Sequence, residues 1–145
     1  MPKGPMAHSA SNEDLKFKGL VESCELPISE FSHRAHLRLA YVYLSEHDTE
    51  SAIELMRNSL GRLIHHNGVP PSKFHETLTR AWILAVDHFM NQVVSSNSAD
   101  ELIDRHSELL DTEIMMTHYS AEVLFSEKAR GEFVQPDLDP IPRYE

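Results

Sequence analysis

The chain lacks several features that would assign it to familiar protein classes. Its single cysteine, Cys24, cannot form an internal disulfide, and one cysteine excludes a zinc site built from several thiolates. Glycine occurs only five times in 145 residues. Neither glycine-rich phosphate-binding pattern, GxGxxG or GxxxxGK[ST], is present. The sequence therefore offers no nucleotide-binding loop of a known type and no cysteine framework.

Long apolar runs and an excess of basic residues are also missing. No stretch approaches the roughly 20 apolar residues that a membrane-spanning helix needs, and the opening MPKGPMAHSASNED has no apolar segment typical of a signal peptide. Thirteen Lys and Arg stand against 23 Asp and Glu, a formal net charge of −10, which disfavours phosphate backbones as partners. We expect a cytoplasmic protein that binds neither nucleic acid nor membranes.

The spacing of the apolar residues predicts helices and no strands. Ser32 and Ser98 are good N-cap residues, and Asn67-Gly68 before Pro70-Pro71 predicts the end of a helix. The expected helices cover 13–24, 32–46, 49–67, 72–94, 98 to about 110, and 112–130 with a break near residue 120. A length of 145 residues suits one domain. We predict an all-α, single-domain bundle of about four main helices plus short ones, with a flexible arm over 1–12 and an extended tail from about 132.

Helical geometry also predicts which side chains face the core. In the first helix these are Leu15, Leu20 and Val21, and in the fifth they are Leu102, Ile103, Leu109 and Leu110.

Ten histidines are present, and three of them fall on predicted apolar faces. His33 and His36 share one face of helix 32–46, one turn apart, and His75 continues the apolar stripe of helix 72–94. His33 and His75 are also expected in the first turns of their helices, where the positive end of the helix dipole favours neutral imidazole. Neutral imidazole is the form that binds a metal ion.

These positions predict a metal site in the bundle core. His33, His36 and His75 are its candidate ligands, and nitrogen-rich ligation without thiolate suits Zn, Fe or Mn. Glu76 is a candidate ligand or general base, and Thr79, one turn further on, is a candidate for orienting a small-molecule substrate. The pattern HETLT is not the HExxH of zinc proteases, because Thr79 stands in place of the second histidine.

Two other readings stay open on the sequence. The histidines can serve metal-free acid/base catalysis or small-ligand binding, with His75 and Glu76 beside a polar pocket. Alternatively, they are structural residues of an interaction protein whose proline-rich tail docks on a partner or on its own surface. His106 is a candidate for a fourth metal ligand or for a core residue. The face on which His118 lies is undefined, because the expected helix break is beside it. Oligomeric state is not indicated.

The runs FSHRAHLRLAYVYL, FHETLTRAW and HYSAEVLFSEKARGEFVQPDLDP resemble a family of small bacterial helical proteins of uncharacterised activity. The resemblance covers roughly residues 27–142, and its most specific pieces are the patterns F-x-H-x-x-H-L-R and H-E-T-x-T. It implies that His33, His36, His75, Glu76 and Thr79 are the shared site positions, and it implies no activity. Phe74 and His118 stand where the family more often has Tyr, which weakens His118 as a shared ligand.

Overall fold

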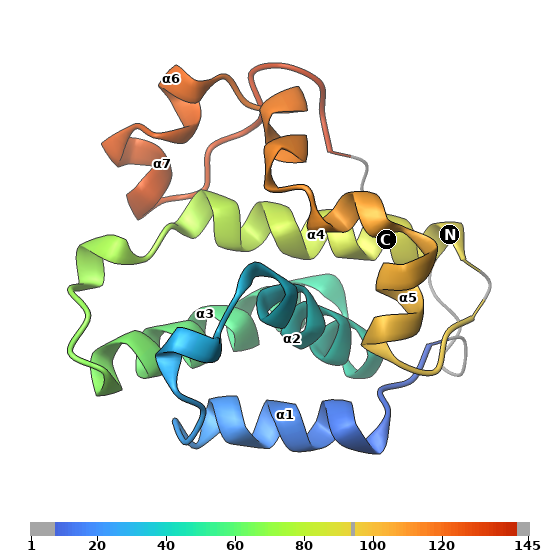
Figure 1. Cartoon of the computed structure of the whole chain (residues 1–145). Helices are drawn as coiled ribbons and strands as arrows, with labels where there is room; N and C mark the ends of the chain where they lie inside the picture. Colours follow the sequence, from blue (N-terminus) through green and yellow to red (C-terminus); the bar gives the residue numbers. More distant parts are fainter. Residues whose placement is uncertain (1–7, 94, 142–145) are drawn as a thin grey trace.

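A computed structural model describes residues 8–93 and 95–141 and shows an all-α protein (Figure 1). Its longer helices are α1 (Asn12–Glu22), α2 (His33–Glu46), α3 (Thr49–His66), α4 (Glu76–Gln92) and α5 (Ala99–Arg105). Shorter helices are η1 (Ile28–Glu30), η2 (Pro71–Lys73), η3 (Ser107–Leu110), η4 (Thr112–Thr117), α6 (Ala121–Leu124) and α7 (Glu127–Gly131). Over the described ranges the only β pairing is an isolated parallel bridge between His8 and Ser96.

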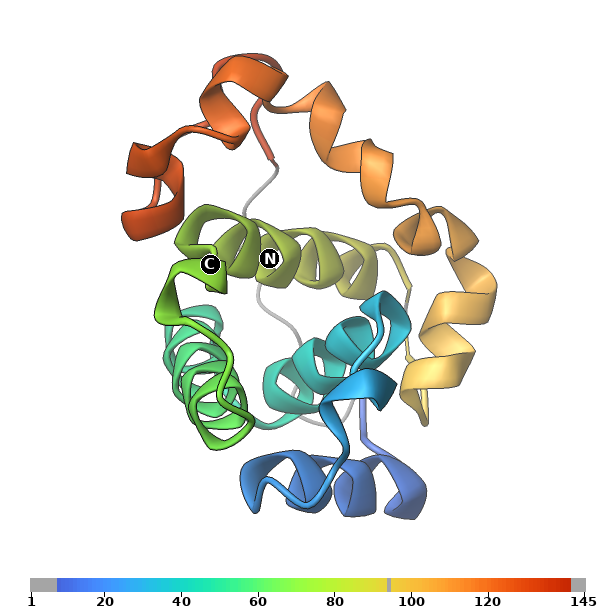
Figure 2. The same cartoon turned by 60° about the vertical axis from the view of Figure 1, so that its left-hand side comes forward.

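Helix α2 lies at the centre of the molecule, in contact with α1, α3, α4 and α5. Its residues from Leu39 to Leu44 are all buried. A helix that is apolar on every side in this way must be covered on every side. Helices α3 and α4 also pack against each other. Most residues of α2 and α4 are buried, so these two are the inner helices of the bundle, whereas α3 lies at its edge (Figure 2).

Local sequence sets the start of α2 and both ends of α3 as predicted. The Ser32 side chain accepts a hydrogen bond from the Ala35 amide at 3.2 Å, and Asp48 caps α3 through the Ser51 amide at 2.7 Å. Gly68, with φ +69°, follows α3 in the left-handed conformation expected of a residue after a helix. Helix α1 ends before Cys24, which has φ 62° and therefore cannot continue a right-handed helix.

Three residues predicted to lie in the core are exposed instead. Leu15 and Leu20 are 38% and 42% exposed, whereas Phe17 and Val21 of the same helix are buried. Asp14 fixes this orientation, because its buried carboxylate points inward to Arg38 of α2, 2.7 Å away. Leu110, also expected in the core, is 40% exposed, because α5 ends at Arg105 and the chain continues as the tighter η3.

The arm expected over residues 1–12 is corrected from His8 onward, while residues 1–7 lie outside the described ranges. The His8 side chain is buried. One ring nitrogen lies 2.6 Å from Ser96 Oγ, and Nε2 donates to the Met90 carbonyl at 2.7 Å. These bonds hold His8 against the end of α4.

The helical stretch predicted for 112–130 does break near residue 120 as expected, but it is divided further into three short helices. The structure has η4, α6 and α7 in its place, and this segment arches over α4 (Figure 2). Ser120 and Ser126 each begin a new helix, accepting hydrogen bonds from the Val123 and Ala129 amides at 3.3 and 3.1 Å. Two closely spaced N-caps are incompatible with one continuous helix.

The tail after α7 lies against its own chain. Tyr119 donates to the Val134 carbonyl at 2.6 Å, the Leu138 amide donates to the His118 carbonyl at 2.9 Å, and Ile141 is buried. Among the described residues, none of the helices combines the length and apolar character that a membrane crossing requires.

Candidate functional site

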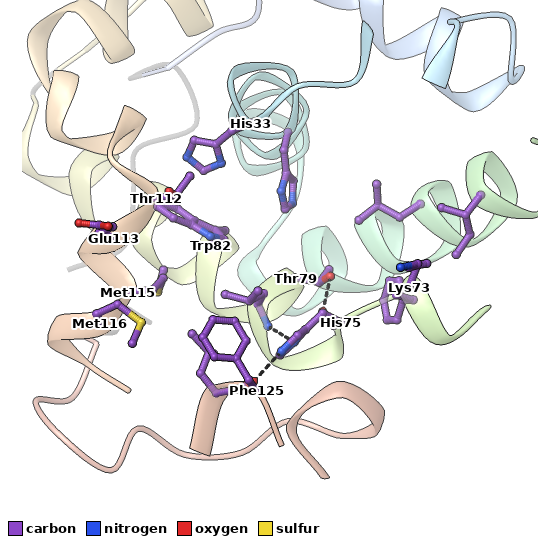
Figure 3. Close-up of a pocket in the computed structure, with 16 residues that line it drawn as sticks. His33, Lys73, His75, Thr79, Trp82, Thr112, Glu113, Met115, Met116 and Phe125 are labelled. Atoms are coloured by element: carbon purple, nitrogen blue, oxygen red, sulfur yellow. Dashed lines mark hydrogen bonds between the residues drawn. The ribbon is translucent and has the colours of Figure 1, made fainter. Parts of the chain in front are cut away.

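A pocket of about 690 Å³ lies between the inner helices and the C-terminal segment (Figure 3). Helix α2 contributes His33 and His36 to its lining. The opposite wall comes from η4 and α6 and includes Met115, Met116 and Phe125. Apolar side chains make up the larger part of the lining, with a few polar groups among them. Pockets of this size and character are typical of small-molecule sites.

Four of the five predicted site residues line this pocket, namely His33, His36, His75 and Thr79. They meet because α2 packs directly against α4. Glu76 is not among the lining residues.

His33 is held at the edge of the pocket by two contacts. Its Nε2–H donates to the Leu109 carbonyl at 2.9 Å, and its ring meets the Trp82 ring edge-on, with 4.5 Å between the centroids. The bond to a carbonyl fixes the proton on Nε2, because a carbonyl oxygen can only accept.

His36 is neutral at pH 7. Burial, with a smaller contribution from the nearby His33, lowers the pKa of His36 from 6.5 to about 4. The side chain as a whole is half-buried, but its Nε2 atom is shut off from solvent and has no hydrogen-bond partner among the described residues.

His75 is the N-cap of α4 and does not lie in its first turn as expected. Pro70-Pro71 direct the chain into η2, so the helix starts only at Glu76. The Nδ1 atom of His75 accepts a hydrogen bond from the Leu78 amide at 3.1 Å, and its Nε2–H donates to the Leu124 carbonyl at 2.8 Å. Burial lowers the pKa of His75, against the opposing effect of the Leu124 bond. Both ring nitrogens are therefore occupied, and the ring joins the start of α4 to the far wall of the pocket.

Two substitutions of His75 separate its role as the N-cap of α4 from its hydrogen bond to the Leu124 carbonyl. His75→Ala loses the cap and the Leu124 bond, and we expect it to cost about 2 kcal/mol of unfolding free energy. His75→Asn keeps a good N-cap but cannot reach Leu124, so it should cost about 1 kcal/mol. Urea unfolding followed by Trp82 fluorescence measures both. Equal losses in the two variants would show that the cap contributes nothing.

The carboxylate of Glu76 is bound by Arg57 of α3 at 2.9 and 2.6 Å. Such a bidentate pair favours a structural role, and this geometry gives Glu76 no position from which to act on a molecule in the pocket. Thr79 does line the pocket, but its hydroxyl donates to the His75 carbonyl at 2.8 Å.

The sequence did not point to the far wall of the pocket. Thr112, Glu113, Met115 and Met116 line it from η4, in a stretch expected to be helical with a break near residue 120. Figure 3 draws Thr112 and Glu113 on the side of His33, whereas Lys73 lies at the other side, beyond His75. The paired N-caps Ser120 and Ser126 were the one signal that this segment is folded back in short pieces.

The described part of the chain contains no group of three or more His, Cys, Asp or Glu side chains arranged to hold a metal ion. The three predicted ligands line one pocket, but His75 has no free nitrogen. The arrangement is a largely apolar cavity lined by the imidazoles of His33, His36 and His75.

No protein-family model, curated protein or solved structure matches the chain.

Proposed function

We propose that this protein binds a small, largely apolar molecule in the pocket between α2, α4 and the η4–α6 wall. The observation that carries the proposal is the cavity itself, whose volume of about 690 Å³ falls within the range of small-molecule sites. Two exposed apolar side chains, Met116 at 36% and Phe125 at 58%, stand at its wall. Apolar groups left exposed beside a cavity favour an apolar occupant.

The proposal can be tested with N-phenyl-1-naphthylamine, an uncharged dye that fluoresces when it leaves water. Trp82 is the only tryptophan of the chain and lines the pocket, so energy transfer from Trp82 to the dye reports binding, and variants of the pocket wall locate it. We expect saturable binding with one dye per chain.

Met116→Glu should weaken dye binding at least about fivefold, because it replaces an apolar contact by a charge at the wall of the pocket. Leu15→Glu is the matched control, since Leu15 is 38% exposed but lies on α1, away from the pocket. We expect the control to change the dye affinity by less than about twofold. Absence of dye binding, or an equal loss in both variants, would contradict the proposed function.

A second candidate function is the binding of one Zn, Fe or Mn ion, and one observation favours it. His33 and His36 lie one turn apart and line the same pocket, and His33 donates Nε2–H to a carbonyl, as imidazoles that bind metal usually do. Water or a bound molecule would supply the remaining ligands.

Elemental analysis of protein purified without chelator tests this candidate. Near-stoichiometric metal in the parent, lost in a His33→Ala/His36→Ala double variant, would support it. No metal in either protein after reconstitution would reject it and leave the apolar pocket as the site.

A further inference from the structure

The imidazole of His33 presents a fixed hydrogen-bond acceptor to the pocket. Among the described residues its ring makes one hydrogen bond, from Nε2–H to the Leu109 carbonyl, so in the neutral ring the proton is on Nε2 and Nδ1 carries a lone pair. Nothing in the described part of the chain hydrogen-bonds to Nδ1, and the ring lines the pocket. A polar atom facing an apolar cavity is stabilised only when a donor reaches it.

His33 is better placed than the other two histidines to contact a ligand. Both nitrogens of His75 are bonded within the protein, and Nε2 of His36 is shut off from solvent. Of these three rings, His33 is the one whose proton is fixed on Nε2 by a carbonyl while Nδ1 has no hydrogen bond among the described residues, so Nδ1 of His33 is the defined acceptor.

The charges around His33 favour an uncharged donor. Glu113 is the one acidic residue of the lining and lies on the side of His33, so it disfavours a carboxylate there (Figure 3). Lys73, the basic residue of the lining, lies at the other side. An ammonium group would lose its water to apolar surroundings and gain only an exposed carboxylate in return.

The lining near His33 also suits an aromatic body. Trp82 supplies a ring, and Met115 and Met116 supply thioethers, which make favourable contacts with aromatic rings. We propose that the ligand is an uncharged aromatic molecule carrying a hydroxyl group, which donates a hydrogen bond to Nδ1 of His33. This inference rests on the proposed function, because it needs the pocket to bind small molecules.

Competition against the dye with three matched naphthalenes tests the inference on the full chain. They are 2-naphthol, which carries a donor, 2-methoxynaphthalene, which carries only an acceptor, and 2-naphthoate, which is an anion. We expect 2-naphthol to bind about 3- to 10-fold tighter than the methyl ether, because it gains one net hydrogen bond. We expect 2-naphthoate to bind weakest of the three. The preference for the naphthol should vanish in His33→Phe and persist in His66→Phe, which replaces an exposed histidine outside the pocket.

If His33→Phe does not fold, a spectroscopic measurement on the unchanged protein tests the inference instead. In ¹⁵N-histidine spectra, 2-naphthol should shift the resonance of the unprotonated His33 Nδ1, and the methyl ether should not. Equal affinities of naphthol and ether, or tighter binding of naphthoate, would overturn the inference while the proposed function stands. If neither the dye nor any of the naphthalenes binds, the proposed function fails together with the inference.

Discussion

Lowering the pH from 7 to 4 is expected to reduce the free energy of unfolding by about 3 kcal/mol through His36 alone. In the folded protein the pKa of His36 is about 4, because the ring is buried, whereas in the unfolded chain it returns to 6.5. Between about pH 6.5 and 4, His36 is therefore protonated in the unfolded chain but neutral in the folded protein. The stability is lost as the pH falls from about 6.5 to about 4, and the loss levels off below pH 4, where the folded state also binds the proton.

Urea unfolding at several pH values measures this effect. His75 and His88 also have pKa values lowered by burial, so the parent protein should lose stability in the same direction through them. His36→Phe keeps a ring of similar size and should remove the contribution of His36 to the slope of unfolding free energy against pH. The control His66→Phe removes a histidine from the exposed end of α3. A slope between pH 6.5 and 4 that is the same in His36→Phe and the parent would contradict the assignment.

The second large effect concerns Asp14, a buried carboxylate that connects three helices. It accepts hydrogen bonds from Arg38 of α2 at 2.7 Å, from the Ala99 amide at the start of α5 at 2.9 Å, and from the Ser11 amide at 3.1 Å. Asp14→Ala leaves the buried Ala99 amide and the Arg38 guanidinium without this acceptor. We expect it to cost about 3 kcal/mol of unfolding free energy.

Glu13→Ala is the matched control, because Glu13 occupies the same turn of α1 but is exposed. It should cost less than about 0.5 kcal/mol. Asp14→Asn keeps the shape and part of the accepting capacity, so its loss should lie between those of Asp14→Ala and the control. A loss in Asp14→Ala no larger than in Glu13→Ala would show that the network contributes nothing.

Asp14 also has a defined acid dependence. Burial alone would raise its pKa, but the hydrogen bonds from Ala99, Arg38 and Ser11 outweigh it and hold the pKa below its usual value of 3.8. The stability that Asp14 contributes is therefore present above about pH 4 and is lost as the pH falls through its lower folded pKa. Asp14 and His36 thus act in successive pH ranges, which lets the two effects be measured separately.

Local sequence determined where the main helices lie and which face of α2 and α4 turns inward, but not which face of α1 does so. The apolar period of 32–46 and 72–94 predicted that His33, His36 and Thr79 face the interior, and all three line the pocket together with His75. Ser32, Asp48 and Gly68 set helix ends because the hydrogen bonds of a cap and the backbone freedom of glycine act within a few residues. Such signals depend on near neighbours in the chain, so they are readable without the fold.

Only the tertiary structure decided what each site residue touches. Glu76 pairs with Arg57, 19 residues earlier, and His75 and His33 donate to carbonyls 49 and 76 residues later. The far wall of the pocket comes from residues 112–125, whose short helices carry no periodic pattern that predicts what they cover. The apolar period of a helix predicts the direction in which a side chain points from that helix. The residue that this side chain contacts depends on how the helices pack. Packing in turn depends on the burial and hydrogen bonding summed over the whole chain. The sequence by itself therefore determined the helices and the inward histidines, and packing alone made them part of a pocket.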